Sequence, residues 1–256
     1  MKPYMSEMKK SWEDEYSISF YEVDTKNEVF LPILWSFMQE TAWHHADHLK
    51  VGYLDLAENN SFWALSRLFI QMDEYPRWGD KIRIKTWLAG MGRLFALRNF
   101  SIINPKGEII GTARSAWLVL DLKSRRPQRV EPLFKRILPL LDRPAEAEEP
   151  EKIPDSVHPR EENLFKVRYS DIDMHHHVNN TKYIEWVLDR YPYEMNQTHH
   201  IHTFEINFLA ESSHGDEISV HTEPFGDSPP AFLHSVFRKG DGRELCRARV
   251  SWKRID

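Results

Sequence analysis

An internal repeat constrains the fold of this 256-residue chain more than any other feature of its sequence. Residues 79–86 read Gly-Asp-Lys-Ile-Arg-Ile-Lys-Thr and residues 215–222 read Gly-Asp-Glu-Ile-Ser-Val-His-Thr, a shift of 136 positions (215 − 79). Residues 113–117, Ala-Arg-Ser-Ala-Trp, match residues 248–252, Ala-Arg-Val-Ser-Trp, at a shift of 135 (248 − 113). Two matches at nearly the same shift indicate that the chain contains two copies of one structural plan.

Each copy predicts the same series of elements. After the Gly-Asp turn, apolar and polar residues alternate, which is the pattern of a half-buried strand. Further strands are expected at residues 97–103 and 232–238, each followed by a turn. A helix precedes the strands of each copy, at residues 32–50 and 181–191. This order predicts an α+β fold of two tandem hotdog domains, each an antiparallel sheet wrapped around a central helix, which form an internal pseudo-dimer.

The composition changes between the two copies. Residues 141–160 are rich in Pro and acidic residues and lack apolar periodicity, which is typical of a linker. We therefore expect an N-terminal domain over residues 1–140 and a C-terminal domain over residues 161–256, each long enough to bury a core.

The overall composition excludes several classes of protein. A net charge of −5 argues against general nucleic-acid binding, and no apolar run approaches the roughly 18 residues of a membrane span. The single cysteine, Cys246, rules out an intrachain disulfide and suits a reducing compartment. Because the N-terminal residues 1–7 lack an apolar signal core and are not of the Ser/Arg-rich, acid-poor kind that directs import into organelles, we expect a cytoplasmic protein.

Residues 171–180 hold the densest group of reactive side chains, Asp-Ile-Asp-Met-His-His-His-Val-Asn-Asn. They lead into the second predicted helix, which an Asn side chain is suited to cap. Carboxylates and imidazoles beside a helix N-terminus are suited to proton transfer and to stabilising negative charge at a carbonyl. Adjacent histidines point in different directions, so we expect no metal at this run.

The other histidines and the lone thiol have simpler interpretations. His44 and His48 have the i, i+4 spacing of zinc ligands, but position 45 is His rather than the Glu of the zinc-protease motif. Buried or cleft-lining histidines are therefore expected on the first helix. No Gly-x-Ser-x-Gly motif is present, which argues against a serine hydrolase of the α/β type.

Several motifs resemble those of one enzyme family. Residues 173–183 resemble the Asp-x-Asn-x-His-Val-Asn-Asn-x-x-Tyr motif of plant and bacterial acyl-[acyl-carrier-protein] thioesterases. Gln-Glu-Thr-Ala at residues 39–42 and Tyr-Pro-Arg-Trp-Gly-Asp at residues 75–80 are similar to further motifs of that family, in the same order. The resemblance implies hydrolysis of the fatty acyl thioester on an acyl carrier protein, which releases free fatty acid and ends chain elongation, with no cofactor.

The resemblance also implies the site residues. Asp173, His177 and Glu211 match the family's catalytic positions, whereas His175 stands where the family usually has Asn. A histidine there adds a group that titrates near neutral pH, so His175 is a fourth catalytic candidate that either orients the thioester or moves protons. Ser212 stands where many members have Cys, which argues against a thiol mechanism.

Two routes are open to these residues. Glu211 is suited to activate water as a general base with His177 relaying the proton, and this is the route that we favour. Alternatively, Asp173 attacks the carbonyl and forms an acyl-enzyme anhydride. Asn179 and Asn180 are expected at the helix entry, where free backbone N–H groups bind the substrate's carbonyl oxygen.

The resemblance assigns the acyl chain to the first half, and the first half lacks a catalytic pair at the matching place, because residues 23–27 contain one Asp with no following His. Aromatic and aliphatic residues crowd its helix and next strand, and Trp35, Met38 and Trp63 are our candidates for the slot. The resemblance implies that the partner is an acyl carrier protein with an acyl-phosphopantetheine. Its acidic surface is expected to dock on a basic cluster, in which Arg125 and Arg126 are our main candidates: Lys123, Arg125, Arg126, Arg129, Lys135 and Arg136.

Two other functions remain open at this point. Hotdog folds also hydrolyse acyl-CoA, and the basic cluster favours the carrier-bound donor only modestly. A non-catalytic acyl-binding double hotdog would have no need for Asp173, His177 and Glu211 together. The internal pseudo-dimer is compatible with a monomer and with a homodimer.

Overall fold

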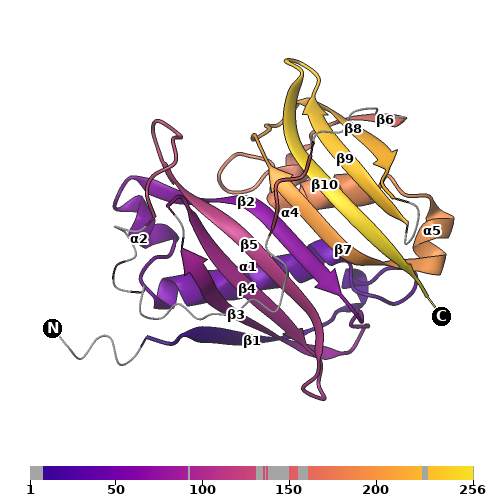
Figure 1. Ribbon diagram of the computed structural model, residues 1–256, viewed down its shortest axis with the longest axis horizontal. Coiled ribbons are helices and arrows are strands. Elements are labelled where there is room, and N and C mark those ends of the chain that lie inside the picture. Colours follow the sequence, from indigo (N-terminus) through magenta and orange to yellow (C-terminus); the bar gives the residue numbers. More distant parts are fainter. Residues whose placement is uncertain are drawn as a thin grey trace.

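One antiparallel sheet passes through both halves of the protein (Figure 1). The computed structural model describes residues 8–91, 93–130, 135, 137, 150–154, 161–226 and 230–255. The first half consists of β1 (Ser11–Ser17), η2 (Phe20–Glu22), α1 (Leu31–His48), α2 (Tyr53–Ala57), β2 (Ser61–Met72), β3 (Lys81–Met91), β4 (Phe95–Ile103) and β5 (Ile109–Asp121). The second half consists of β6 (Glu161–Lys166), η4 (Tyr169–Asp171), α4 (Asn180–Leu188), α5 (Tyr193–Thr198), β7 (His199–Phe208), β8 (Glu217–Pro224), β9 (Ala231–Arg238) and β10 (Arg243–Arg254).

The strand order shows that the second half repeats the first. The ten strands lie in the order β1-β3-β4-β5-β2-β7-β10-β9-β8-β6, and neighbouring strands are antiparallel. Counted outward from the central pair, β2, β5, β4, β3 and β1 correspond to β7, β10, β9, β8 and β6. The predicted α+β fold of two tandem hotdog domains is confirmed.

The two halves share one core because β2 pairs directly with β7. Leu68 and Ile70 of β2 lie opposite Ile206 and Phe204 of β7, and all four side chains are buried. A contiguous apolar cluster extends from this pair to the inner faces of α1 and α4, which contact each other. The central pair therefore fixes where the second half places its residues relative to the first.

Local sequence explains the individual elements. In β3, Ile82, Ile84 and Thr86 point into the core while Lys81 and Lys85 face solvent, as expected for period-two alternation. In α1, a proline near the N-terminus suits the first turn, and apolar residues three and four apart form the buried face. The observed bounds of α1 and α4 lie within a few residues of those predicted.

The described part of the predicted linker contacts the sheet. The Glu151 N–H donates to Glu205 Oε1 at 2.8 Å, and the Ile153 N–H donates to Asn207 Oδ1 at 2.9 Å. Residues 150–154 thus cross β7 as an extended segment with its own partners. Residues 141–149 and 155–160 of the linker, and Arg136 of the basic cluster, lie outside the described residues. No helix in the described part of the chain is long and apolar enough to cross a membrane.

Candidate active site

A tight turn between η4 and α4 carries three of the predicted catalytic residues. The Asp173 N–H donates to the His177 carbonyl at 2.9 Å, and Asp173 Oδ1 accepts from the His175 N–H at 2.8 Å. His176 occupies the left-handed position of the turn with φ +65° and is exposed. Asp173, His175 and His177 all border one cleft.

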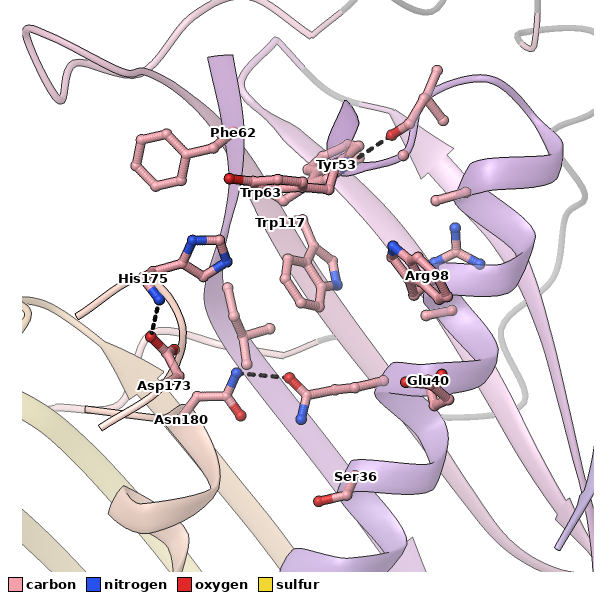
Figure 2. Close-up of a pocket in the computed structure, with 18 of the residues that line it drawn as sticks. Ser36, Glu40, Tyr53, Phe62, Trp63, Arg98, Trp117, Asp173, His175 and Asn180 are labelled. Carbon is pink, nitrogen blue, oxygen red and sulfur yellow. Dashed lines mark hydrogen bonds between the residues drawn. The ribbon is translucent and has the colours of Figure 1, made fainter. Parts of the chain in front are cut away.

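The start of α4 closes this turn. Asn179 Oδ1 accepts from the Thr181 N–H at 3.0 Å, so an Asn side chain caps the helix as its sequence suggests. Asn180 Oδ1 accepts from Trp35 Nε1 at 2.7 Å. Asn180 Nδ2 donates to Gln39 Oε1 at 2.7 Å (Figure 2). Asn180 therefore ties the second half to α1 of the first half.

Glu211 lies in the loop after β7, which is anchored to α4. The Tyr183 hydroxyl lies 2.9 Å from Ser212 Oγ and accepts from the Ser212 N–H at 3.1 Å. The Ser212 carbonyl accepts from the Val178 N–H at 3.0 Å, which joins this loop to the turn before α4. Burial raises the pKa of Tyr183 well above its ordinary value, so its hydroxyl stays protonated. Ser212, at the position where many family members have Cys, has a structural role here.

The structure brings His177 and Glu211 into contact. His177 Nε2 lies 3.3 Å from Glu211 Oε2, and both side chains are partly exposed in the cleft. Arg125, from the turn after β5, adds a cation: its Nη2 is 3.2 Å from His177 Nε2 and 3.4 Å from Glu211 Oε2. Asp173 and His175 border the same cleft. A carboxylate, an imidazole and a guanidinium thus lie within hydrogen-bonding reach of one another.

An apolar slot opens from this cleft into the first half. The cleft has a volume of about 670 Å³ and the slot about 540 Å³, and Tyr53, Phe62, Trp63, Asp173 and His175 border both. Figure 2 shows the slot, with residues of α1 on one side and Trp63 and Trp117 on the other. Its lining is mainly apolar and combines the small side chains of Ala42, Ala46 and Ala96 with larger ones: Trp43, Leu65, Leu88 and Trp117.

A polar group marks the side of the slot away from the cleft. Arg98 lies across the pocket from His175 (Figure 2), and its Nη1 donates to His45 Nδ1 at 3.0 Å and to Thr86 Oγ1 at 3.2 Å. Desolvation by burial lowers the pKa of Arg98 to about 10 and that of His45 to about 4. At neutral pH the guanidinium is therefore charged and the imidazole neutral, which matches the direction of their hydrogen bond.

Two predicted slot residues lie in the core instead. Trp35 and Met38 are fully buried and border neither the cleft nor the slot. Each residue of a helix turns the side-chain direction by about 100°, so these two face the sheet, where Trp35 lies 5.9 Å from the Phe100 ring. Trp63 does border both cavities, and its Nε1 donates to the Val51 carbonyl at 2.9 Å.

Some bordering residues carry no signal in the sequence. Tyr53 of α2 places its ring 5.2 Å from that of His175, and Phe62 of β2 lies under the Arg125 guanidinium at 4.7 Å. Neither belongs to a motif, and their proximity to the turn depends on how the halves are joined. Arg126 is exposed and is not among the residues that border the cleft.

The first half contains a counterpart of the turn that carries Asp173, with different side chains. Asp24 Oδ1 accepts from the Lys26 N–H at 2.8 Å, and Asn27 takes the left-handed position with φ +64°. When Asp24 is aligned with Asp173, a shift of 149 positions (173 − 24), Lys26 and Glu28 correspond to His175 and His177. Lys26 Nζ pairs with Asp24 at 2.9 Å and also donates to the Asn196 carbonyl at 2.6 Å. The first copy of the turn therefore fastens the two halves together.

Sequence comparison assigns the family. Residues 9–138 match the profile of the acyl-ACP (acyl carrier protein) thioesterase N-terminal domain, and residues 155–254 match that of its C-terminal domain. The chain belongs to the acyl-ACP thioesterase family. It is 26% identical to an oleoyl-acyl carrier protein thioesterase of Arabidopsis thaliana over 95% of this chain and 76% of that protein.

Solved structures of this family superpose on the chain. An acyl-ACP thioesterase from Bacteroides thetaiotaomicron is similar with a TM-score of 0.86 and 32% identity, covering 95% of this chain and 98% of that one. The 12:0-ACP thioesterase from Umbellularia californica has a TM-score of 0.84 at 23% identity over 96% of this chain and 98% of that one, which shows a shared fold.

The acyl-ACP thioesterase site has the parts that hydrolysis of a carbonyl compound requires. A carboxylate and an imidazole are in contact, the N-terminal end of α4 reaches the junction of cleft and slot through Asn180, and an apolar slot leads away from them. Among the described residues, no group of three or more His, Cys, Asp and Glu side chains is arranged to hold a metal ion.

Proposed function

We propose that this enzyme hydrolyses the thioester of fatty acyl-ACP and releases free fatty acid and holo-carrier protein. The observation that carries the proposal is the contact of His177 Nε2 with Glu211 Oε2 at 3.3 Å, in a cleft that continues into an apolar slot. Relatives named for oleoyl and dodecanoyl substrates on the carrier protein support the same reaction.

Glu211 is the proposed general base. Its contacts with His177 and Arg125 both involve Oε2, and Oε1 takes part in neither, so Oε1 is available to a water molecule. When that water attacks the carbonyl carbon, its proton passes to Glu211 and His177, and the thiolate leaving group takes up a proton in turn. The positive end of the α4 dipole at Asn180 stabilises the oxyanion. His175, which rests against Tyr53, orients the thioester at the mouth of the slot.

Direct attack by water is favoured over an acyl-enzyme at Asp173. Asp173 Oδ1 accepts from the His175 N–H at 2.8 Å, which engages the oxygen within its own turn. Rapid quench of a single turnover in ¹⁸O-water distinguishes the routes: we expect the label in the fatty acid and none in the enzyme. Label in the Asp173 carboxyl group would establish the covalent route.

The carrier protein is proposed to dock on the basic turn after β5. Lys123, Arg126 and Arg129 are exposed and lie within four residues of Arg125, which borders the cleft. Reversing the charge at Arg126 should raise KM for acyl-ACP, because acidic carrier and basic turn attract each other, and leave KM for acyl-CoA nearly unchanged. Lys81→Glu, far along the sheet on β3, is the matched control.

The function is tested by measuring release of free thiol from acyl-ACP and acyl-CoA over a range of chain lengths. We expect kcat/KM to be greater for the carrier-bound donor at every length. Equal or greater values for acyl-CoA would make the enzyme an acyl-CoA thioesterase, and binding without turnover would make it an acyl-binding protein.

We place the enzyme in a reducing compartment, such as a bacterial cytoplasm. Its one cysteine, Cys246, is a fully buried free thiol. All catalytic groups come from one chain, so a single chain is the proposed active unit, either alone or within a homodimer.

A further inference from the structure

Arg125 is a residue of the first half that reaches the catalytic pair of the second. Its Nη2 lies 3.2 Å from His177 Nε2 and 3.4 Å from Glu211 Oε2, and these two atoms are 3.3 Å apart. The three groups therefore form a nearly equilateral triangle. The guanidinium also lies over the Phe62 ring, 4.7 Å from its centre, which adds a cation–π contact on one side.

The backbone is shaped to hold Arg125 in this place. Its N–H donates to the Asp121 carbonyl at 2.9 Å, and the Asp121 side chain accepts from the Ser124 N–H at 2.7 Å. Those hydrogen bonds from Ser124 hold the pKa of Asp121 below its ordinary value, so the anchor is ionised at neutral pH. Arg125 has φ +56°, a left-handed conformation that side-chain-bearing residues rarely adopt and that concentrates at functional sites. A charge that only attracts a partner protein has no need of this conformation.

We propose that Arg125 is a positioning residue for the reaction, which holds His177 and Glu211 together in the arrangement that activates water. This inference rests on the proposed hydrolysis. While His177 is neutral, its Nε2 lone pair accepts an N–H of Arg125, which places the ring proton on Nδ1. Once Nε2 is protonated, it donates to Glu211 Oε2, and Arg125 remains paired with that oxygen. Because a guanidinium donates and does not deprotonate, it serves both states without exchanging a proton itself.

The surrounding charges leave this role to Arg125. Asp173 and His175 face the cleft from the turn before α4, and Arg243 borders it from β10. Arg238 of β9 donates to the Glu211 carbonyl at 3.2 Å, but its guanidinium is engaged by Asp241 at 2.8 Å. In the contacts described, Arg125 is the cation at the reacting ends of both His177 and Glu211.

Kinetics of Arg125→Gln, Arg125→Lys and the matched control Arg254→Gln, an exposed arginine at the end of β10, test the proposal. Two substrates are used, acyl-ACP and acyl-N-acetylcysteamine, which has neither carrier nor phosphate. We expect Arg125→Gln to lower kcat about 10- to 100-fold on both, as displaced catalytic groups do. The acid limb of its pH–rate profile should move to higher pH, since loss of a fixed positive charge eases protonation of its neighbours. Arg125→Lys should recover part of kcat, and Arg254→Gln should keep the wild-type pH–rate profile.

A rise in KM for acyl-ACP alone, with an unchanged pH profile and normal turnover of the small thioester, would overturn the proposal and return Arg125 to docking. A second readout is independent of turnover. The ¹⁵N signals of the His177 ring should change their tautomer pattern in Arg125→Gln and not in Arg254→Gln, and identical patterns in the two variants would also overturn the proposal. If wild-type enzyme hydrolyses neither substrate, the proposed function fails while this readout still tests the contact.

Discussion

Lowering the pH from 8 to 5 should destabilise this protein through two buried histidines. His45 is 0% and His234 1% exposed. Desolvation by burial lowers the pKa of His45 to about 4 and that of His234 to about 3. Each ring is hydrogen-bonded in its neutral form, His45 to Arg98 at 3.0 Å and His234 to the Tyr191 hydroxyl at 2.7 Å.

The sign and size of the effect follow from proton linkage. A histidine whose pKa is lowered by folding binds its proton more readily in the unfolded chain, so its contribution is complete at pH 8 and declines as the pH falls below about 6.5. At pH 5 the linkage relation gives a loss of about 2 kcal/mol for each residue, or about 4 kcal/mol for both. A loss of this size is a large part of the roughly 5–15 kcal/mol that stabilises a typical domain.

Urea unfolding, followed by tryptophan fluorescence at pH 8, 7, 6 and 5, measures this loss of unfolding free energy. The readout is the change in unfolding free energy with pH, because carboxylates contribute equally to wild type and variants. His45→Gln and His234→Gln should each lose about 2 kcal/mol less than wild type between pH 8 and 5. His176→Asn, in the exposed turn, is the control and should follow wild type. If the unfolding free energy of either buried-histidine variant changes with pH as steeply as that of the wild type, the reasoning is refuted.

Two further predictions follow from the slot and from the first-half turn. Ala96→Leu adds three carbons to the lining of the slot and should make the preferred acyl chain about two carbons shorter, because each methylene left outside the slot costs about 0.8 kcal/mol. Ala231→Leu on β9 is the control. An unchanged chain-length profile of kcat/KM would show that Ala96 does not bound the acyl site. Lys26→Met should lower the unfolding free energy by about 3 kcal/mol, because it leaves the largely buried carboxylates of Asp24 and Glu28 without their cation. The control Lys81→Met removes an exposed ion pair with Glu15 and should cost less than about 1 kcal/mol in the same urea titration. Equal losses would contradict the role of Lys26 in fastening the two halves together.

The sequence predicts the fold of each half but not how the halves are joined. Alternation after the two Gly-Asp turns predicts β3 and β8, and helical spacing predicts α1, because these patterns depend only on neighbouring residues. The pairing of β2 with β7 joins strands more than 130 positions apart and depends on the fit of Leu68 and Ile70 against the other half. No local pattern reports such a fit.

The same distinction explains what could be predicted of the site. Asp173 and His177 lie in one motif, so their proximity follows from the sequence, and Glu211 follows only from resemblance to the family. Arg125 reads as one of several basic residues in a run, and its left-handed backbone and reach across the β2–β7 pair become visible only in the structure. Trp35 shows the converse. Its aromatic character makes it a candidate for the lining of the slot, but its position on α1 directs its side chain into the core.

The most direct test of the account is the initial rate of fatty acid release from acyl-ACP by wild type and by Glu211→Gln. Glu185→Gln, which changes a carboxylate of α4 that pairs with Lys182, is the matched control. If Glu211 is the general base, kcat should fall about 10²- to 10⁴-fold in Glu211→Gln, with little change in the control. A Glu211→Gln enzyme that releases fatty acid at the wild-type rate would contradict the central claim.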